Sequence, residues 1–237
     1  MDIKRTIAIG DVHGCLAEFK RLLVKVNYNP IEDRVILLGD LIDRGPDSIG
    51  VLRLARELNL ECVMGNHEHK FLKWYKTFGT KADVYDKKDY YANLTQEDID
   101  YIFKMPSYIV VGDIIITHAG LKPDTPIDKQ TKDDLLYLRY TDKNRKFISL
   151  KKIHKLGKEA CDAHFWTEFW KGPESVVYGH NVTSLEIPTI EEVAPNITCY
   201  GIDTGCCFGG HLTALILETK EIIQVKSDKV YYQIGFD

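Results

Sequence analysis

The chain has 237 residues, of which 44% are hydrophobic and 28% charged, as in an ordinary soluble globular protein. Its net charge of −4 at pH 7 argues against extended, sequence-independent binding of nucleic acid. Because this length fits one α/β domain with a sizeable core, we expect residues 1–237 to form a single domain.

The sequence shows no signal for export or membrane insertion. The first apolar run, residues 6–9, is too short for a secretory signal, and no stretch approaches the length of a transmembrane helix. The six cysteines are scattered without a C-x-x-C motif, which argues against a disulfide framework or a zinc ribbon. We therefore expect a cytoplasmic protein with reduced thiols, in which Cys206 and Cys207 fill the core.

Short apolar runs alternate with helical patterns in the first third of the chain. Strands are predicted at residues 6–9, 34–38 and 61–64, each followed by a glycine. Between them, apolar residues recur at helical spacing over 16–26 and 49–58, with Asp47 or Ser48 as a cap of the second helix. This order is typical of parallel crossover units.

The second half of the chain is predicted to be mainly β. Residues 108–111 and 114–117 flank Gly112-Asp113 and indicate a hairpin. Two segments, about 73–105 and 122–173, fit this frame poorly and look like insertions that could roof a site, the first with a helix at 95–104 and the second mainly helical or irregular. Further strands are expected at 176–178, 197–202, 212–217, 222–225 and 230–234, with a turn at 218–220.

Polar residues of metal-binding type follow the first three predicted strands. Since the carboxyl ends of parallel strands border the crevice where ligands bind, these segments should converge at one edge of a sheet. Two later strands end in His118 and His180. The three early segments are Gly10-Asp11-Val12-His13-Gly14, Gly39-Asp40-Leu41-Ile42-Asp43-Arg44-Gly45 and Gly65-Asn66-His67-Glu68.

This mixture of nitrogen and oxygen donors suits Mn, Fe or Zn better than Ca or Mg. A single Asp or His at a strand end is usually a cap or a turn residue, but five such ends in one chain indicate a site. Two ions that share a carboxylate lie about 3.5–4 Å apart and can bind a bridging hydroxide that attacks phosphorus in line. The pattern predicts a two-metal phosphoesterase, and it gives no role to His69, His154, His164 or His211.

The ordered motifs resemble the signature blocks of the phosphoprotein phosphatase branch of the calcineurin-like metallophosphoesterases, over about residues 6–217. The resemblance implies an α/β fold, a four-layer α/β/β/α sandwich of two mixed sheets flanked by helices. It also implies two divalent metal ions, manganese in the first place and iron or zinc as alternatives. Their ligands would be Asp11, His13, Asp40, Asn66, His118 and His180.

The same resemblance implies roles around the metal ions. His67 would be the general acid and Asp43 would hold its ring, since a carboxylate orients an imidazole and stabilises its charged form. Arg44 would clamp the phosphate together with Arg139, with Arg145 as the competitor for the second place, and Asn66 would also contact substrate.

The substrate is expected to be phosphorylated, a phosphoprotein or a nucleotide. Residues 202–215 are similar to bacterial small phosphatases and to bacterial diadenosine tetraphosphate hydrolases, with Phe208 where many relatives have Tyr. The tetraphosphatase type often lacks the acid that Asp43 supplies and has Asp where Glu68 stands. We therefore expect a serine/threonine protein phosphatase that uses a metal-bridging hydroxide.

Two other activities stay open. A bis(5'-nucleosyl)-tetraphosphatase would need a site for a base, and a Tyr-rich stretch could stack one, although we expect it to pack on the body of the protein. A polynucleotide end phosphatase could use the basic stretch 139–158, although a solvated helix face explains it. A binding module with a dead site is disfavoured by the complete ligand set. The tyrosines of the Tyr-rich stretch, which could stack a base, are Tyr75, Tyr85, Tyr90 and Tyr91.

Overall fold

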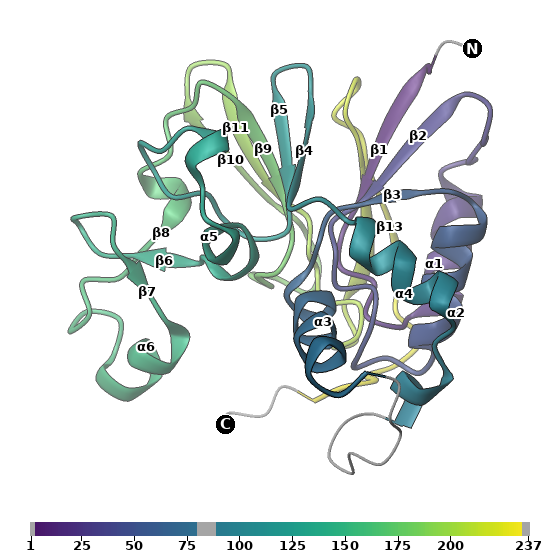
Figure 1. Cartoon of the computed structure of the whole chain (residues 1–237). Helices are drawn as coiled ribbons and strands as arrows, with labels where there is room; N and C mark the ends of the chain where they lie inside the picture. The colour runs from purple at the N-terminus through teal and green to yellow at the C-terminus, as the bar shows by residue number, and fades with distance from the viewer. Residues whose placement is uncertain (1–2, 80–88, 234–237) are drawn as a thin grey trace.

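A computed structural model of the chain describes residues 3–79 and 89–233, and Figure 1 shows two sheets side by side with helices on their outer sides. Each sheet has five strands. The first runs in the order β13 (Ile222–Lys226), β12 (His211–Ile216), β1 (Arg5–Ile9), β2 (Asp33–Leu37) and β3 (Glu61–Cys62). The second runs β10 (Thr189–Ala194), β11 (Ile197–Gly201), β9 (Ser175–Tyr178), β5 (Ile114–Thr117) and β4 (Tyr108–Val111).

Both sheets are mixed. In the first, β1, β2 and β3 are parallel, while β12 and β13 are antiparallel to their neighbours. In the second, β5, β9 and β11 are parallel, and β4 and β10 pair with them antiparallel at the two edges. The parallel strands at the centre of each sheet therefore point their carboxyl ends the same way, as the site prediction requires.

Among the residues described, four helices lie beside the first sheet, and polar residues cap two of them. On the side of the first sheet lie α1 (Leu16–Lys25), α2 (Ser48–Glu57), α3 (Asn66–Phe78) and α4 (Gln96–Lys104). Asp47 caps α2 by accepting a hydrogen bond of 2.7 Å from the Gly50 N–H, as predicted. Thr95, expected to be the first residue of a helix, instead caps α4. No helix within the described ranges is long and apolar enough to span a membrane.

Three separate hydrophobic clusters fill the spaces between four layers. Along β1, Ile7 and Ile9 face the helices, whereas Ala8 faces the second sheet. Ile116 joins Ala8 between the sheets, while Ile115 packs on the outer side with Trp166. This alternation follows the two-residue period of a strand and confirms the predicted α/β/β/α sandwich.

The segment 122–173 covers the outer side of the second sheet and is mainly helical or irregular, as predicted, but it also contains short strands. It contains a three-stranded sheet of order β7 (Phe147–Ile148), β6 (Tyr140–Thr141) and β8 (His164–Phe165). It also contains α5 (Lys132–Tyr137), α6 (Leu150–Leu156) and the short 3-10 helices Ile127–Lys129 and Trp166–Glu168. Strands of two residues carry no periodic signal, so this sheet could not be predicted from the sequence.

Three further differences concern single elements. The edge strand β10 was not predicted, and α3 begins directly at Asn66, inside the third motif. The strand predicted at 230–234 is wrong over its described part, where Val230 forms only an isolated bridge with Phe208. This segment is instead fixed by the N–H groups of Tyr231 and Tyr232, which both donate to the Cys207 carbonyl, at 3.0 and 2.9 Å.

Glu68 holds two site loops together from inside the protein. Its side chain is fully buried, and its two oxygens accept hydrogen bonds from four backbone N–H groups. Three of these donors, in residues 40–42, lie in the loop after β2, and the fourth is Gly65 at the start of α3. The loop after β2 is therefore fixed to the start of α3 by one carboxylate.

We predict that Glu68→Gln lowers the free energy of unfolding by about 1–3 kcal/mol, because the new NH2 group faces N–H donors that lose their acceptor. Urea unfolding of the variant measures this change. Glu57→Gln, at an exposed position at the end of α2, is the matched control and should change stability little. Equal stability of the two variants would contradict this role of Glu68.

Candidate active site

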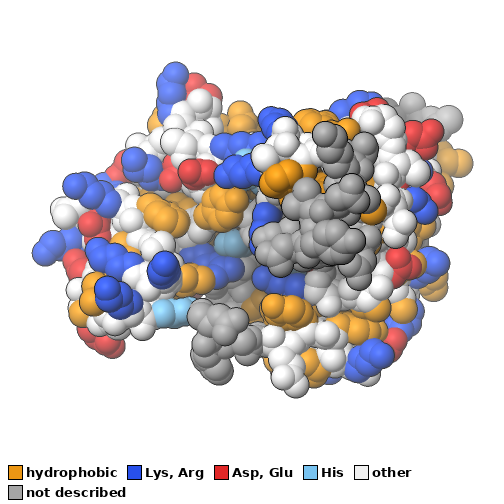
Figure 2. Space-filling model, turned by 60° about the horizontal axis from the view of Figure 1, so that its bottom comes forward, with side chains coloured by type: hydrophobic (Ala, Val, Ile, Leu, Met, Phe, Trp, Pro, Cys, Tyr) orange, Lys and Arg blue, Asp and Glu red, His pale blue; other side chains and the backbone are white. Residues whose placement is uncertain are grey.

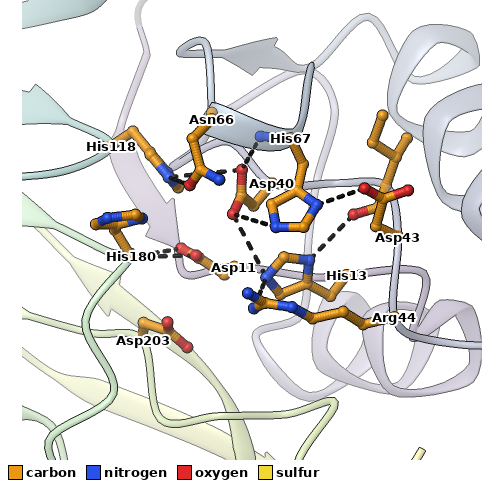
Figure 3. Close-up of polar contacts among 12 residues, drawn as sticks. Asp11, His13, Asp40, Asp43, Arg44, Asn66, His67, His118, His180 and Asp203 are labelled. Atoms are coloured by element: carbon orange, nitrogen blue, oxygen red, sulfur yellow. Dashed lines mark hydrogen bonds and ion pairs between the residues drawn. The ribbon is translucent and has the colours of Figure 1, made fainter. Parts of the chain in front are cut away.

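The strand ends of both sheets bring the predicted ligands to one place, as Figure 3 shows. Asp11 and His13 follow β1, Asp40 follows β2, and Asn66 begins α3 just after β3. From the second sheet, His118 follows β5 and His180 follows β9. All six side chains predicted as metal ligands therefore lie in one cluster at the carboxyl ends of parallel strands.

Asp40 lies at the centre of this cluster and is buried. Its Oδ2 lies 3.5 Å from His13 Nε2 and 3.8 Å from His67 Nε2, and its Oδ1 lies 3.5 Å from His118 Nε2. Burial raises the pKa of Asp40, but the surrounding imidazoles lower it by more, so the pKa of Asp40 lies below its ordinary value. Asp40 is therefore an anion that faces several ring nitrogens.

Backbone carbonyls fix the tautomers of two of these histidines. His13 Nδ1 lies 3.0 Å from the Ile42 carbonyl oxygen, and His118 Nδ1 lies 2.7 Å from that of Leu38. The proton therefore sits on Nδ1, and the Nε2 lone pair is directed towards Asp40. Burial lowers the pKa of His13 to about 3 and also lowers that of His118, so both rings are neutral at pH 7.

The donor atoms fit two cations that share Asp40. Within the described ranges, His13, Asp40 and His67 bring donor atoms within 4.8 Å of one another, and so do Asp40, His118 and His180. Asn66 Oδ1 adds an oxygen 2.9 Å from His118 Nε2. Neutral imidazoles, a carboxylate and an amide oxygen that converge in this way form a ligand set for borderline divalent metals.

Asp11 is held by the strand end of the second sheet. Its two carboxylate oxygens accept the His180 N–H, at 3.2 and 3.1 Å. A Cβ at Gly179 would come 2.0 Å from Asp11 Oδ1, so only glycine fits there. Burial raises the pKa of Asp11 well above its usual range, and the negative charges of Asp203 and Asp40 add to this effect, which a bound cation would relieve.

Asp203 is a buried acidic residue of the site that the sequence prediction missed. It lies two residues beyond β11, next to the other strand ends in Figure 3, and accepts the Gly205 N–H at 3.0 Å. Burial raises its pKa to about 6. The signal was present, because Ile202-Asp203-Thr204-Gly205 repeats the pattern of an apolar run followed by an acid and a glycine.

His67 and Asp43 form a hydrogen-bonded pair beside the cluster. His67 Nδ1 donates to Asp43 Oδ2, and the ring turns its Nε2 towards Asp40. Tyr90 donates its hydroxyl to the other oxygen of Asp43, a contact that the sequence did not predict. Asp43 is buried, so the position of the His67 ring is fixed from behind.

The remaining predicted tyrosines pack on the body of the protein wherever they are described. Tyr91 packs edge-on against Phe71, with ring centroids 4.9 Å apart, and Tyr75 lies 5.9 Å from the same ring. Tyr85 lies outside the described residues. Tyr75 and Tyr91 therefore pack against the protein itself, as expected.

Two arginines reach the site. Arg44 Nη1 lies 2.6 Å from His13 Nε2, and its guanidinium lies over the rings of Phe208 and Tyr232, at 5.2 and 5.9 Å. Arg139 donates to the His180 carbonyl at 2.8 Å, and its Nε is buried and makes no hydrogen bond within the described part of the chain. Arg145 is exposed and pairs with Asp124, so it lies outside the site.

Positively charged side chains are spread over the face of the molecule that Figure 2 views. Figure 2 shows Lys, Arg and His side chains in the hollow of the face it views, and further Lys and Arg side chains spread over the part to the left. The predicted basic stretch is exposed at the lysines of α6 and its flanks, in line with a solvated surface. The positive charge that reaches the cluster is that of Arg44 and Arg139.

Known proteins resemble this chain over nearly its whole length. One relative is the bis(5'-nucleosyl)-tetraphosphatase PrpE (asymmetrical) of Oceanobacillus iheyensis, 30% identical over 92% of this chain and 91% of its own. Another is the symmetrical bis(5'-nucleosyl)-tetraphosphatase of Wigglesworthia glossinidia brevipalpis, 29% identical over 92% of this chain and 98% of its own.

Solved structures share the fold. A crystal structure provisionally assigned as a diadenosine tetraphosphatase superposes with a TM-score of 0.78 and 28% identity, over 95% of this chain and 97% of its own. A protein serine/threonine phosphatase from Saccharomyces cerevisiae has a TM-score of 0.55 at 15% identity, over 95% of this chain and 80% of its own, a likeness of fold alone.

The family of calcineurin-like phosphoesterases matches residues 4–213. This range runs from β1 into β12 and includes every strand end that contributes to the cluster. We conclude that this chain belongs to the calcineurin-like phosphoesterase family and is a metallophosphoesterase, a hydrolase that acts on phosphate esters.

Proposed function

We propose that this protein is a bis(5'-nucleosyl)-tetraphosphatase that requires divalent metal ions and cleaves a dinucleoside polyphosphate such as diadenosine tetraphosphate. The observation that carries the proposal is the similarity to tetraphosphatases from one end of the chain to the other, at 30 and 29% identity. The structure with a TM-score of 0.78 points to the same substrate class.

The comparisons thus favour the alternative activity over the serine/threonine protein phosphatase that the sequence led us to expect. That expectation rested on Asp43 and Glu68. In the structure, Asp43 bonds to His67, and Glu68 bonds to backbone N–H groups inside the protein. Both support the common phosphoesterase machinery, and neither is placed to distinguish an amino acid from a nucleoside.

In this proposal the cluster holds two metal ions. Asp11 and His13 would hold one, Asn66, His118 and His180 would hold the other, and Asp40 would serve both. Two divalent ions held there would activate the attacking water and polarise the phosphate. Manganese is our first choice, with iron and zinc as alternatives, because all three accept mixed imidazole and carboxylate ligands.

Side chains of the protein then donate the proton and bind the charged phosphate. His67, with its Nδ1–H bound to Asp43, carries a proton on Nε2 and donates it to the leaving oxygen. Arg44 and Arg139 bind the phosphate oxygens with planar forks of N–H groups, and Asn66 also contacts the phosphate. Tyr90 positions Asp43 through its hydroxyl.

The substrate class can be tested directly. After removal of metal with EDTA and reloading with Mn²⁺, we expect kcat/KM on diadenosine tetraphosphate to exceed that on a phosphoserine peptide or a phosphorylated RNA end by about tenfold or more, which corresponds to about 1.4 kcal/mol of transition-state binding. Chromatography of the products tells two ADP molecules, the symmetrical cut, from ATP plus AMP. A faster reaction on the phosphopeptide would refute the proposal.

The metal requirement has its own control. The EDTA-treated protein should have lost its activity on p-nitrophenyl phosphate, and Mn²⁺ should restore it. Absence of turnover with each of Mn, Fe, Zn, Co and Ni would overturn the assignment as a metal-dependent phosphatase.

The role of His67 predicts a dependence on the leaving group. For His67→Asn we expect kcat on an alkyl phosphate to fall by roughly 10²–10⁴-fold, because the departing alkoxide then has no proton donor. On p-nitrophenyl phosphate, whose leaving group needs little protonation, the loss should be much smaller. Metal content, measured by atomic emission, should stay the same, and equal losses on both substrates would rule out the general-acid role.

A further inference from the structure

A cavity of about 420 Å³ lies between α3, α5 and β7, beside the metal cluster and separate from it. It is lined by Lys73, Asp133, Asp134, Tyr137 and Phe147. Phe147 exposes 49% of its surface, although it is a large apolar residue, and Tyr137 is half-buried. Aromatic surfaces together with a few charged groups provide what a nucleobase needs, faces for stacking and partners for its polar edge.

Helix α3 connects this cavity to the metal cluster. Asn66 is its first residue, and residues three and seven positions later, His69 and Lys73, lie on the same face. His69 Nδ1 lies 3.1 Å from the Tyr137 hydroxyl, so this face meets α5. Seven residues of helix rise about 10 Å, a distance that a nucleoside with its phosphates can span.

Lysines of α3 and α5 add positive charge along this path. Burial, and then the charges of Lys132 and Lys73, lower the pKa of His69 to about 4, so its ring is neutral at pH 7. Burial, and then the charges of Lys76 and Lys73, also lower the pKa of Lys132. The lining also contains Asp133 and Asp134, so Lys73 is the positively charged group of the lining that a polyphosphate would meet.

We propose that this cavity is a nucleoside subsite, in which a base stacks against Tyr137 and Phe147 while Lys73 meets the phosphates that lead to the metal cluster. Asp133 accepts a hydrogen bond from an exocyclic amino group of the base. Asp134 is left out of this role because its carboxylate already accepts hydrogen bonds from Thr131 at the start of α5. The inference rests on the proposed function and assigns one of the two nucleosides of the substrate to this cavity.

The variant Phe147→Ala tests the subsite, and Phe103→Ala is the matched control. Both phenylalanines are similarly exposed, at 49 and 44%, and Phe103 lies on α4, away from the cavity lining. We expect Phe147→Ala to raise KM for diadenosine tetraphosphate about tenfold relative to its effect on p-nitrophenyl phosphate, because a stacked base is lost. Phe103→Ala should leave this ratio as in the wild type.

A binding measurement separates this inference from the proposed function. Calorimetry on the Mn²⁺-loaded protein compares α,β-methylene-ADP with methylenediphosphonate, which lacks the nucleoside. In the wild type and in Phe103→Ala, the nucleoside should tighten binding about tenfold or more, whereas in Phe147→Ala the two ligands should bind almost equally.

Each outcome decides one of the two statements. If the nucleoside does not tighten binding to the wild type, or still tightens binding to Phe147→Ala, the subsite is refuted even if diadenosine tetraphosphate is cleaved. If the wild type does not cleave that substrate but the increase in affinity due to the nucleoside depends on Phe147, the subsite is supported and the proposed tetraphosphatase activity is refuted. Circular dichroism of both variants confirms that they are folded.

Discussion

The arrangement of this site depends on one buried carboxylate. Asp40 faces the Nε2 atoms of three imidazoles, its Oδ1 also accepts the His67 N–H at 2.9 Å, and its own N–H donates to Glu68. A buried anion is costly unless it has partners, and Asp40 has partners from both sheets. The loop after β2, the start of α3 and the end of β5 are therefore fixed around the same group.

The layers of the fold explain why these partners meet. Ala8, Ile116 and Val177 pack between the sheets, so β1, β5 and β9 lie close across a thin hydrophobic layer. Their carboxyl ends then border one crevice, and glycines such as Gly179 let the loops come close enough for Asp11 to receive a backbone N–H. The hydrophobic core thereby determines the distance between the two halves of the ligand set.

Much of this arrangement could be predicted from the sequence, because it is encoded locally. An apolar run followed by Gly and Asp or His predicted the strands and the positions of Asp11, Asp40 and His118. The strand β10 was missed because exposed Glu191 and Glu192 interrupt its apolar pattern at the edge of a sheet. Local patterns also gave no indication of which substrate the site accepts.

Contacts between distant segments had no signature in the sequence. Tyr90 meets Asp43 across 47 positions, and Tyr232 lies over Arg44 from the far end of the described chain. Such pairs depend on how layers pack and not on any repeating pattern. The sequence therefore indicated the ligand cluster more fully than the residues that position it.

The pairing of β1 with β12 has a consequence for how the protein is made. β1 lies inside the first sheet, and its Ile7 pairs with Ile216, from the opposite end of the chain. A nascent chain that has emerged only through its first three motifs still has one open edge on β1, the strand that precedes Asp11 and His13. The ligand cluster can reach its final form only after β12 has paired with β1, so its assembly depends on a contact of long sequence separation, which slows folding.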